Sequence, residues 1–224
     1  MRLALFDVDG TLVDSRAMIT ASMAEAFAAV GLPPPPRDRM MAVVGLSLHT
    51  AIGRLVPAAD AALHERLASA YREANWANRA SGAHAEDLFE GARDLLMALQ
   101  KNADVKLGIA TGKGRRGVSH LLATHGMEGW FATVQTADDH PSKPDPAMVV
   151  AALAETAVAP AAAVMIGDTS YDIEMGRAAG VGTIGVTWGS HPESELRHAG
   201  AHMIAKSFKE LQSCLESLWQ ERAA

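Results

Sequence analysis

Two aspartates separated by one residue stand near the start of the chain, in the run Asp7-Val8-Asp9-Gly10-Thr11. They follow the short apolar segment 3–6, and residues i and i+2 point the same way where a strand ends, so the two carboxylates can converge. Two such anions repel each other strongly, and a hard divalent cation is the usual remedy. The alternative is an Asp-Gly turn in which Asp9 only caps the turn. The run therefore predicts either a carboxylate pair that holds a cation or an ordinary turn.

A hydroxyl side chain stands at the end of a second apolar segment, 105–110. Thr111 is followed by Gly112, so the hydroxyl and the nearby N–H groups can hydrogen-bond an anion. The same dipeptide is also an ordinary way to leave a strand. The segment is not a Walker A loop, because Gly114 rather than serine or threonine follows Lys113.

A lysine between a serine and a proline forms the third cluster, Ser142-Lys143-Pro144-Asp145-Pro146. Pro144 favours an extended conformation for Lys143, and Pro146 suits the first turn of a helix. The ammonium group can thus be held rigidly over a phosphate. A lone lysine is more often a solvated surface residue, which is the competing interpretation.

Two further acids, Asp168 and Asp172, form the fourth cluster after the apolar segment 163–167. One carboxylate can bind a metal ion while the other orients the ion or its waters. Alternatively, Asp168 or Thr169 caps the following helix and Asp172 compensates the helix dipole. Each cluster is ambiguous alone, but all four fall where apolar segments end or helices begin, which is where ligands bind in open α/β sheets.

Apolar segments without polar alternation alternate with helical patterns along most of the chain, which predicts a doubly wound, Rossmann-like α/β core with a parallel sheet. The predicted strands are Leu3–Phe6, Val105–Ala110, Ala132–Gln135, Ala163–Gly167 and Thr183–Thr187. The predicted helices of this core are Gly91–Gln100, Arg115–His125, Pro146–Glu155, Asp172–Ala179 and the closing helix Lys209–Arg222.

The segment from Ser15 to Ser81 interrupts this alternation, because it contains no strand pattern. It predicts an inserted all-α cap over residues 15–81, with residues 1–14 and 82–224 as the catalytic core. A lobe of this size can cover a site at the strand ends. Its predicted helices are Met18–Val30, Ser47–Leu55 and Ala58–Asn78, with an extended turn at Pro33–Pro36.

Composition excludes several classes of partner. The formal net charge of −6 leaves no basic excess for a nucleic-acid backbone. No stretch reaches the roughly 18 uninterrupted apolar residues that a membrane helix needs, and two acids interrupt the N-terminal segment before a signal-peptide core could develop. The single Cys214 cannot form an intramolecular disulfide. We therefore expect a cytoplasmic protein that binds neither nucleic acid nor membrane; nothing in the sequence indicates its oligomeric state.

The order and the residue types of the four clusters resemble the motifs of the haloacid dehalogenase-like hydrolase superfamily. The resemblance covers nearly the whole chain, and the inserted segment resembles the small helical cap between the first and second motifs of that superfamily. The segments most similar to phosphoglycolate phosphatase-like members are FDVDGTLVDS, ATGKGRRG, TADDHPSKPDP and MIGDTSYDIEMGRAAG.

The resemblance implies a Mg²⁺-dependent phosphatase that forms an aspartyl phosphate. Asp7 would be the nucleophile, and Asp9 the general acid and then the general base. Thr111, Gly112 and Lys143 would bind the transferred phosphoryl group, with Thr111 and Lys143 counted among the catalytic residues. The metal would be held by the carboxylates of Asp7 and Asp168 and by the main-chain carbonyl of Asp9. Asp172 would contact these ligands or their waters and not bind the metal directly.

Asp9 favours attack on phosphorus, because the dehalogenases attack carbon and typically lack this second aspartate. A sugar phosphomutase of the β-phosphoglucomutase type shares all four motifs, but the segment after Asp14 lacks the histidine often found there. A phospho-accepting receiver domain is a non-enzyme alternative, opposed by the chain length and by the position of the aspartates. Phosphoglycolate is the leading substrate by resemblance, with inorganic pyrophosphate and small sugar phosphates as alternatives.

The sequence does not rank the residues that select the substrate. Candidates to touch a second anionic group are Arg16, Ser47, His49, Arg54 and Lys113, and the loop Gly45-Leu46-Ser47 allows close backbone approach. Tyr71, Trp76, His64 and His84 are expected to pack the cap or its hinge.

Overall fold

A parallel sheet of six strands forms the centre of the computed structural model, which describes residues 1–82 and 84–223. The strand order is β5-β4-β1-β6-β7-β8, and every neighbouring pair is parallel. The strands are β1 (Arg2–Phe6), β4 (Val105–Thr111), β5 (Thr133–Thr136), β6 (Ala163–Gly167), β7 (Gly182–Val186) and β8 (Met203–Ala205).

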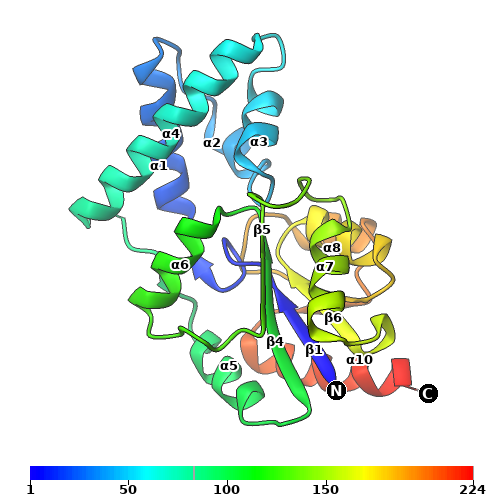
Figure 1. Cartoon of the computed structure of the whole chain (residues 1–224). Coiled ribbons are helices and arrows are strands. Elements are labelled where there is room, and N and C mark those ends of the chain that lie inside the picture. Colours follow the sequence, from blue (N-terminus) through cyan, green and yellow to red (C-terminus); the bar gives the residue numbers. More distant parts are fainter. Residues whose placement is uncertain (83, 224) are drawn as a thin grey trace.

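Helices cover both faces of this sheet (Figure 1). Along β1, Ala4 and Phe6 face one hydrophobic cluster, while Leu3 and Leu5 face another, as the two-residue period of a strand requires. The first cluster contains residues of α5 (Ala92–Gln100), α6 (Arg115–Thr124) and α10 (Phe208–Ala223). The second contains residues of α7 (Ala147–Thr156) and α8 (Ser170–Ala178).

Four helices between β2 and β3 form a separate lobe above the carboxyl ends of the strands (Figure 1). Their own hydrophobic cluster includes Met23, Phe27, Ile52 and Leu67. The short strands β2 (Val13–Asp14) and β3 (Asp87–Leu88) pair antiparallel where the chain enters and leaves this lobe. The lobe helices are α1 (Arg16–Ala29), α2 (Arg37–Met41), α3 (Leu48–Leu55) and α4 (Ala61–Ser81).

The predicted fold class is confirmed, and most predicted elements differ from the observed ones by one to three residues at their ends. Helix α4 begins at Ala61 rather than Ala58, because the Asp60 side chain accepts a hydrogen bond from the Leu63 N–H at 2.8 Å and caps it. No sequence pattern predicted α2, β2, β3, β8, the 3₁₀ turn η1 (Pro160–Ala162) or α9 (Glu193–His198). None of the described helices is long and apolar enough to cross a membrane.

Candidate active site

The four sequence clusters meet at the carboxyl edge of the sheet. Asp7 follows the central strand β1, Thr111 ends the neighbouring strand β4, and Asp168 follows β6 on the other side. The backbone N–H of Asp7 donates to the carbonyl of Ile166 at 2.9 Å, which prolongs the pairing of β1 with β6 up to the site. The chain continues from β1 to β4 on one side of the sheet and from β6 to β7 on the other, so the site lies where the strand order reverses, the usual ligand position in such sheets.

The loop after β1 requires glycine at position 10. Gly10 has a φ of +86°, and a Cβ atom there would lie 2.2 Å from Oδ2 of Asp168. A side chain at this position would therefore push the first and fourth clusters apart. The close approach also lets the Thr11 hydroxyl donate to Asp168 at 2.9 Å.

Three buried carboxylates lie together: oxygens of Asp7, Asp168 and Asp172 are within 4.8 Å of one another. Lys143, whose side chain is completely buried, lies between them, with its Nζ 2.8 Å from Oδ1 of Asp7 and 2.6 Å from Oδ1 of Asp172. Burial lowers the pKa of Lys143, but the charges of Asp172 and Asp7 outweigh this, so its pKa is raised. The ammonium is therefore charged, and the surface interpretation of Lys143 is wrong.

Burial raises the pKa of Asp7 to about 7; Lys143 opposes the shift, and the charges of Asp172 and Asp168 add to it. Burial and the charge of Asp172 raise the pKa of Asp168 to about 6, against hydrogen bonds from Ser190 and Thr11. Without a cation, three carboxylates share one ammonium, so the cluster resists full ionisation.

The raised pKa values of Asp7 and Asp168 predict an unusual pH dependence of stability in the metal-free protein. Between the ordinary value of 3.8 and about 6 to 7, the unfolded chain releases protons that the folded protein keeps. The contribution of these groups to the free energy of unfolding is therefore complete below about pH 4 and is lost as the pH rises through 7. Urea unfolding in EDTA at about pH 5 and pH 8 should show wild type losing stability relative to Asp168→Asn. Equal pH dependence of the two proteins would contradict the prediction.

The donor set fits a hard divalent cation. Neither carboxylate oxygen of Asp7 has a well-directed hydrogen bond from another described residue, although both are buried. Oδ1 has the ion-pair contact with Lys143, whereas Oδ2 has no partner among the described residues. A buried carboxylate oxygen without a partner, beside a second acid, is stabilised by a cation that prefers oxygen ligands, such as Mg²⁺. The Asp9 side chain is not part of this three-acid cluster, and the contact of its main-chain carbonyl with a metal stays a prediction.

Asp168 is fixed by the loop that follows β7, and Asp172 by the start of its own helix α8. Oδ2 of Asp168 accepts a hydrogen bond from the Ser190 N–H at 2.7 Å. Thr169 is the N-cap of α8 and forms a capping box with Asp172, whose Oδ2 accepts from the Thr169 hydroxyl at 2.7 Å. The capping interpretation is thus correct for Thr169 and Asp172, and it is compatible with a metal site because Oδ1 of Asp172 points to Lys143 instead.

Asp9 belongs to a second, separate ion-pair network. Its Oδ1 lies 2.7 Å from Nζ of Lys113, which also lies 2.7 Å from Glu86, and Glu86 pairs with Arg79 of α4 at 2.6 Å. Burial raises the pKa of Asp9, but the Lys113 charge and hydrogen bonds from Lys113 and Ser15 outweigh it, so the pKa is lowered. Lys113 is among the candidates predicted from the sequence, whereas Glu86 and Arg79 are not, because their isolated positions carry no motif.

Thr111 and Gly112 lie beneath the loop between α2 and α3. The Thr111 hydroxyl accepts a hydrogen bond from the Lys113 N–H at 3.2 Å. A Cβ on Gly112 would lie 2.5 Å from the carbonyl oxygen of Gly45, so only glycine lets the lobe approach the core this closely. Both residues line a cavity that also contains Asp7, Asp9 and Lys113.

The other candidates for a second anionic group fall into two sets. Arg16 pairs with Asp14 in a second depression that none of the three clustered aspartates lines, and Arg54 donates to the Tyr171 hydroxyl at 2.7 Å. Ser47 and His49 do line the cavity. Tyr71 and Trp76, expected to be packing residues, line it as well.

Comparison with known proteins agrees with this geometry. Residues 4–186 match the family model described as haloacid dehalogenase-like hydrolase, so the chain belongs to that family. A crystal structure described as a hydrolase from Pseudomonas syringae superposes with a TM-score of 0.85 at 26% identity, covering 97% of this chain and 99% of that one. The predicted family is thereby confirmed.

Curated relatives carry several activity names. The probable phosphatase IndB of Dickeya dadantii is 32% identical over 96% of this chain and 94% of its own. Phosphoglycolate phosphatase 1 of Pseudomonas aeruginosa is 27% identical over 96% of this chain and 80% of its own. Tyrosine-protein kinase PtkA of Mycobacterium tuberculosis is 34% identical over 84% of this chain, which spans only 62% of that protein. The family and its phosphatase members confirm the prediction that the chain is a phosphatase enzyme.

Proposed function

We propose that this phosphatase hydrolyses phosphomonoesters of small metabolites with the help of Mg²⁺ and through an aspartyl phosphate on Asp7. The observation that carries the proposal is the buried arrangement of Asp7 between Lys143 and Asp168, at the floor of a cavity that also holds Asp9 and Thr111. Phosphoglycolate, favoured by the resemblance and by one relative's name, is the reference substrate.

The first step places the new bond on Asp7. An oxygen of Asp7 attacks phosphorus, and the bond to the leaving oxygen breaks with its electron pair remaining on that oxygen. Asp9 gives its proton to the leaving oxygen, so an alcohol departs. Lys143, Thr111 and the Gly112 amide stabilise the charge on the phosphoryl oxygens.

The second step reverses the role of Asp9. Now a carboxylate, Asp9 removes a proton from water, which attacks the phosphorus of the aspartyl phosphate. The bond to Asp7 breaks, and inorganic phosphate leaves with Asp7 restored. A Mg²⁺ held by Asp7, Asp168 and the Asp9 carbonyl would supply neutralising charge to the phosphoryl oxygens.

The lowered pKa of Asp9 suits the second step better than the first. Lys113 keeps the carboxylate charged, so it is ready to accept a proton from water. Delivery of a proton to a leaving alcohol requires that this pairing weaken when the substrate's phosphate is bound. Helix α4, which carries Arg79 of the same network, is part of the proposed cap over residues 15–81.

Metal dependence tests the proposal directly. Protein treated with EDTA is expected to release no phosphate from p-nitrophenyl phosphate, and added Mg²⁺ should restore release. Asp168→Asn should need far more Mg²⁺ for half-maximal activity, because one carboxylate ligand is lost. Turnover that persists in EDTA, or an unchanged Mg²⁺ requirement in Asp168→Asn, would contradict the assigned metal site.

A further inference from the structure

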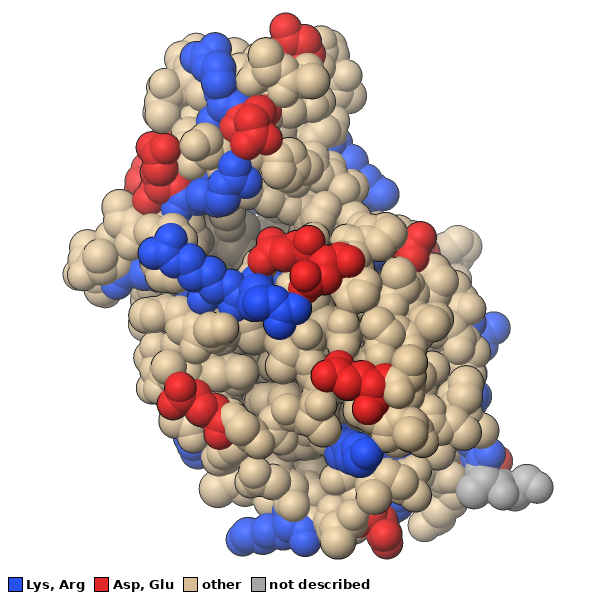
Figure 2. Space-filling view, in the orientation of Figure 1, with Lys and Arg blue, Asp and Glu red and all other residues tan. Residues whose placement is uncertain are grey.

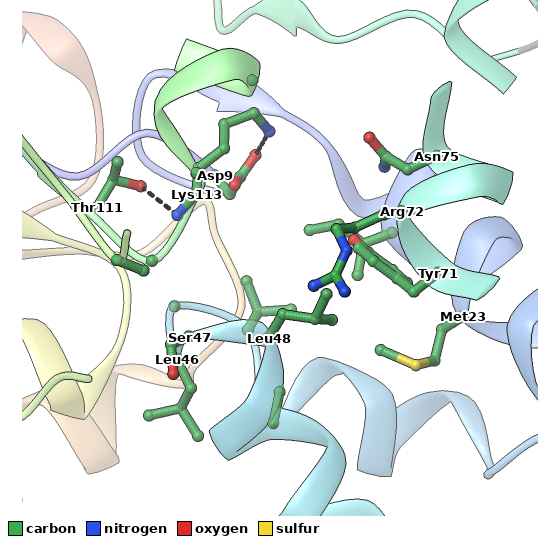
Figure 3. A pocket seen from close by; sticks show the side chains of 18 of the residues that line it. Asp9, Met23, Leu46, Ser47, Leu48, Tyr71, Arg72, Asn75, Thr111 and Lys113 are labelled. Carbon is green, nitrogen blue, oxygen red and sulfur yellow. Dashed lines mark hydrogen bonds and ion pairs between the residues drawn. The ribbon is translucent and has the colours of Figure 1, made fainter. Parts of the chain in front are cut away.

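The cavity above Asp7 is far larger than a phosphoryl group with a two-carbon leaving group requires. Its volume is about 630 Å³, and it extends from Asp9 and Lys113 to the Tyr71 and Asn75 side chains of α4 (Figure 3). This volume lies within the range of about 300–1,000 Å³ typical of pockets that enclose drug-sized ligands.

Hydrogen bonds and ion pairs connect the lobe that covers this cavity to the core. The Ser47 N–H donates to the Ser142 hydroxyl at 2.9 Å, and the Tyr171 hydroxyl donates to the Ala42 carbonyl at 2.8 Å. On the other side of the cavity, Glu86 joins Lys113 of the core to Arg79 of the lobe. The space is therefore not created by a lobe that has swung away from the strand ends.

The wall opposite the acids is mainly apolar. In Figure 3, Leu48 lies on one side of the cavity and Met23 and Tyr71 on another, across the opening from Asp9; Leu46 also lines the cavity. Contact with such a wall makes ligand binding more favourable, because it removes hydrocarbon surface of the ligand from water, in proportion to the area covered. The remaining apolar lining residues of the lobe are Ile19, Met40, Val43, Val44, Ala51 and Trp76.

The charges around the cavity do not favour a second anion. Each of Arg72, Arg79 and Lys113 already pairs with a glutamate, at 2.6 to 2.8 Å. At Arg79 or Lys113, which are both buried, an added carboxylate or phosphate would have to displace Glu86 and leave it unpaired. Arg116 also lines the cavity; it pairs with no described carboxylate and lies over the Trp76 ring, 3.8 Å from its centroid. Figure 2 shows basic and acidic side chains intermixed where the lobe meets the core. The described charged residues that line the cavity balance: Asp7, Asp9, Glu73 and Asp138 against Arg72, Arg79, Lys113 and Arg116.

We propose that the substrate is a phosphomonoester whose leaving group is an apolar body of ring size or larger, enclosed by Leu48, Met23, Tyr71 and Trp76. This inference rests on the proposed phosphatase function and replaces phosphoglycolate and pyrophosphate as preferred substrates. The phosphoryl group lies at Asp7, and the apolar body extends towards α1, α3 and α4.

A series of n-alkyl phosphates from ethyl to octyl tests the proposal, because its members share one leaving-group chemistry and differ only in hydrocarbon length. With Mg²⁺, kcat/KM is expected to rise about two- to fourfold for each methylene until the cavity is filled. Hexyl phosphate should exceed both phosphoglycolate and pyrophosphate by at least about tenfold. A flat series, with phosphoglycolate or pyrophosphate the best substrate, overturns this proposal and leaves the phosphatase standing.

A pair of leucine variants ties the effect to the cavity. Leu48 and Leu63 both pack at the edge of the lobe's hydrophobic cluster, but only Leu48 lines the cavity. Leu48→Ser should reduce the gain in kcat/KM per methylene, whereas Leu63→Ser should keep the wild-type gain. Equal gains in both variants would overturn the assigned wall. Failure of wild type to hydrolyse any ester in the series, together with phosphoglycolate and p-nitrophenyl phosphate, would overturn the phosphatase function as well.

Discussion

Asp7→Asn is expected to abolish phosphate release while leaving the protein folded. The amide oxygen of asparagine is a poor nucleophile, so no phosphoryl-enzyme forms and kcat should fall by at least about 10⁴-fold, as expected for loss of a nucleophile. Asp7 is completely buried beside Asp168 and Asp172, and burial already raises its pKa to about 7. Replacing it with a neutral side chain removes a buried like charge, so the free energy of unfolding in EDTA should not fall.

A matched aspartate provides the control for this result. Asp14 lies seven positions further along the chain, pairs with Arg16 and is outside the acidic cluster. Asp14→Asn should therefore retain turnover of p-nitrophenyl phosphate. Kinetics and urea unfolding measured on both variants separate a chemical loss from a folding defect. Turnover by Asp7→Asn within tenfold of wild type would show that Asp7 is not the nucleophile.

The sheet was predictable from sequence because its strands are short, apolar and buried on both faces. Ala163–Gly167 carries no polar residue and ends at glycine, and Val105–Ala110 carries only Lys106 and is followed by Thr111, so the apolar runs indicate both the type and the length of these strands. Strand β8, by contrast, has three residues at the sheet edge, of which only Ala205 is buried. Such a segment has no periodic signal, since its position depends on pairing with β7.

The floor of the site was predictable for a different reason. Asp7 and Asp168 directly follow strands and Thr111 ends one, and parallel strands bring these ends together independently of how the lobe packs. The roof was not predictable, because residues such as Tyr71 and Arg79 reach the cavity only through the angle at which α4 crosses the strand ends. A tyrosine on an amphipathic helix has the same local pattern whether it fills a core or faces a substrate.

The burial of Lys143 could not be read from its segment either. The pattern Ser142-Lys143-Pro144 is polar and loop-like, and lysine is the residue least expected to be enclosed. It is buried because Asp7 and Asp172 arrive from β1 and α8, more than twenty residues away in sequence on either side. The acidic cluster thus determines where the lysine lies. The lysine in turn offsets the repulsion among the buried carboxylates in the folded protein.

Lys143→Met is accordingly expected to cost stability as well as activity. Methionine fills much of the same space, but Asp172 loses the partner that lies 2.6 Å from its Oδ1, and Asp7 loses its only nearby cation among the described residues. Breaking a buried ion pair by removing one member typically costs about 3–5 kcal/mol. Urea unfolding in EDTA at pH 8 should show a loss of that order, and a smaller one at about pH 5, where Asp7 can take up a proton.

A double variant separates the two roles of Lys143. Lys143→Met/Asp172→Asn removes both charges of the shorter pair, so most of the lost stability should return, because no unpaired carboxylate is left at Asp172. Phosphate release should stay at least about 10²-fold below wild type in both variants, since neither has the ammonium that we propose to stabilise the phosphoryl oxygens. If the double variant regains activity along with stability, Lys143 serves only to fold the site, and its proposed contact with the phosphoryl group is wrong.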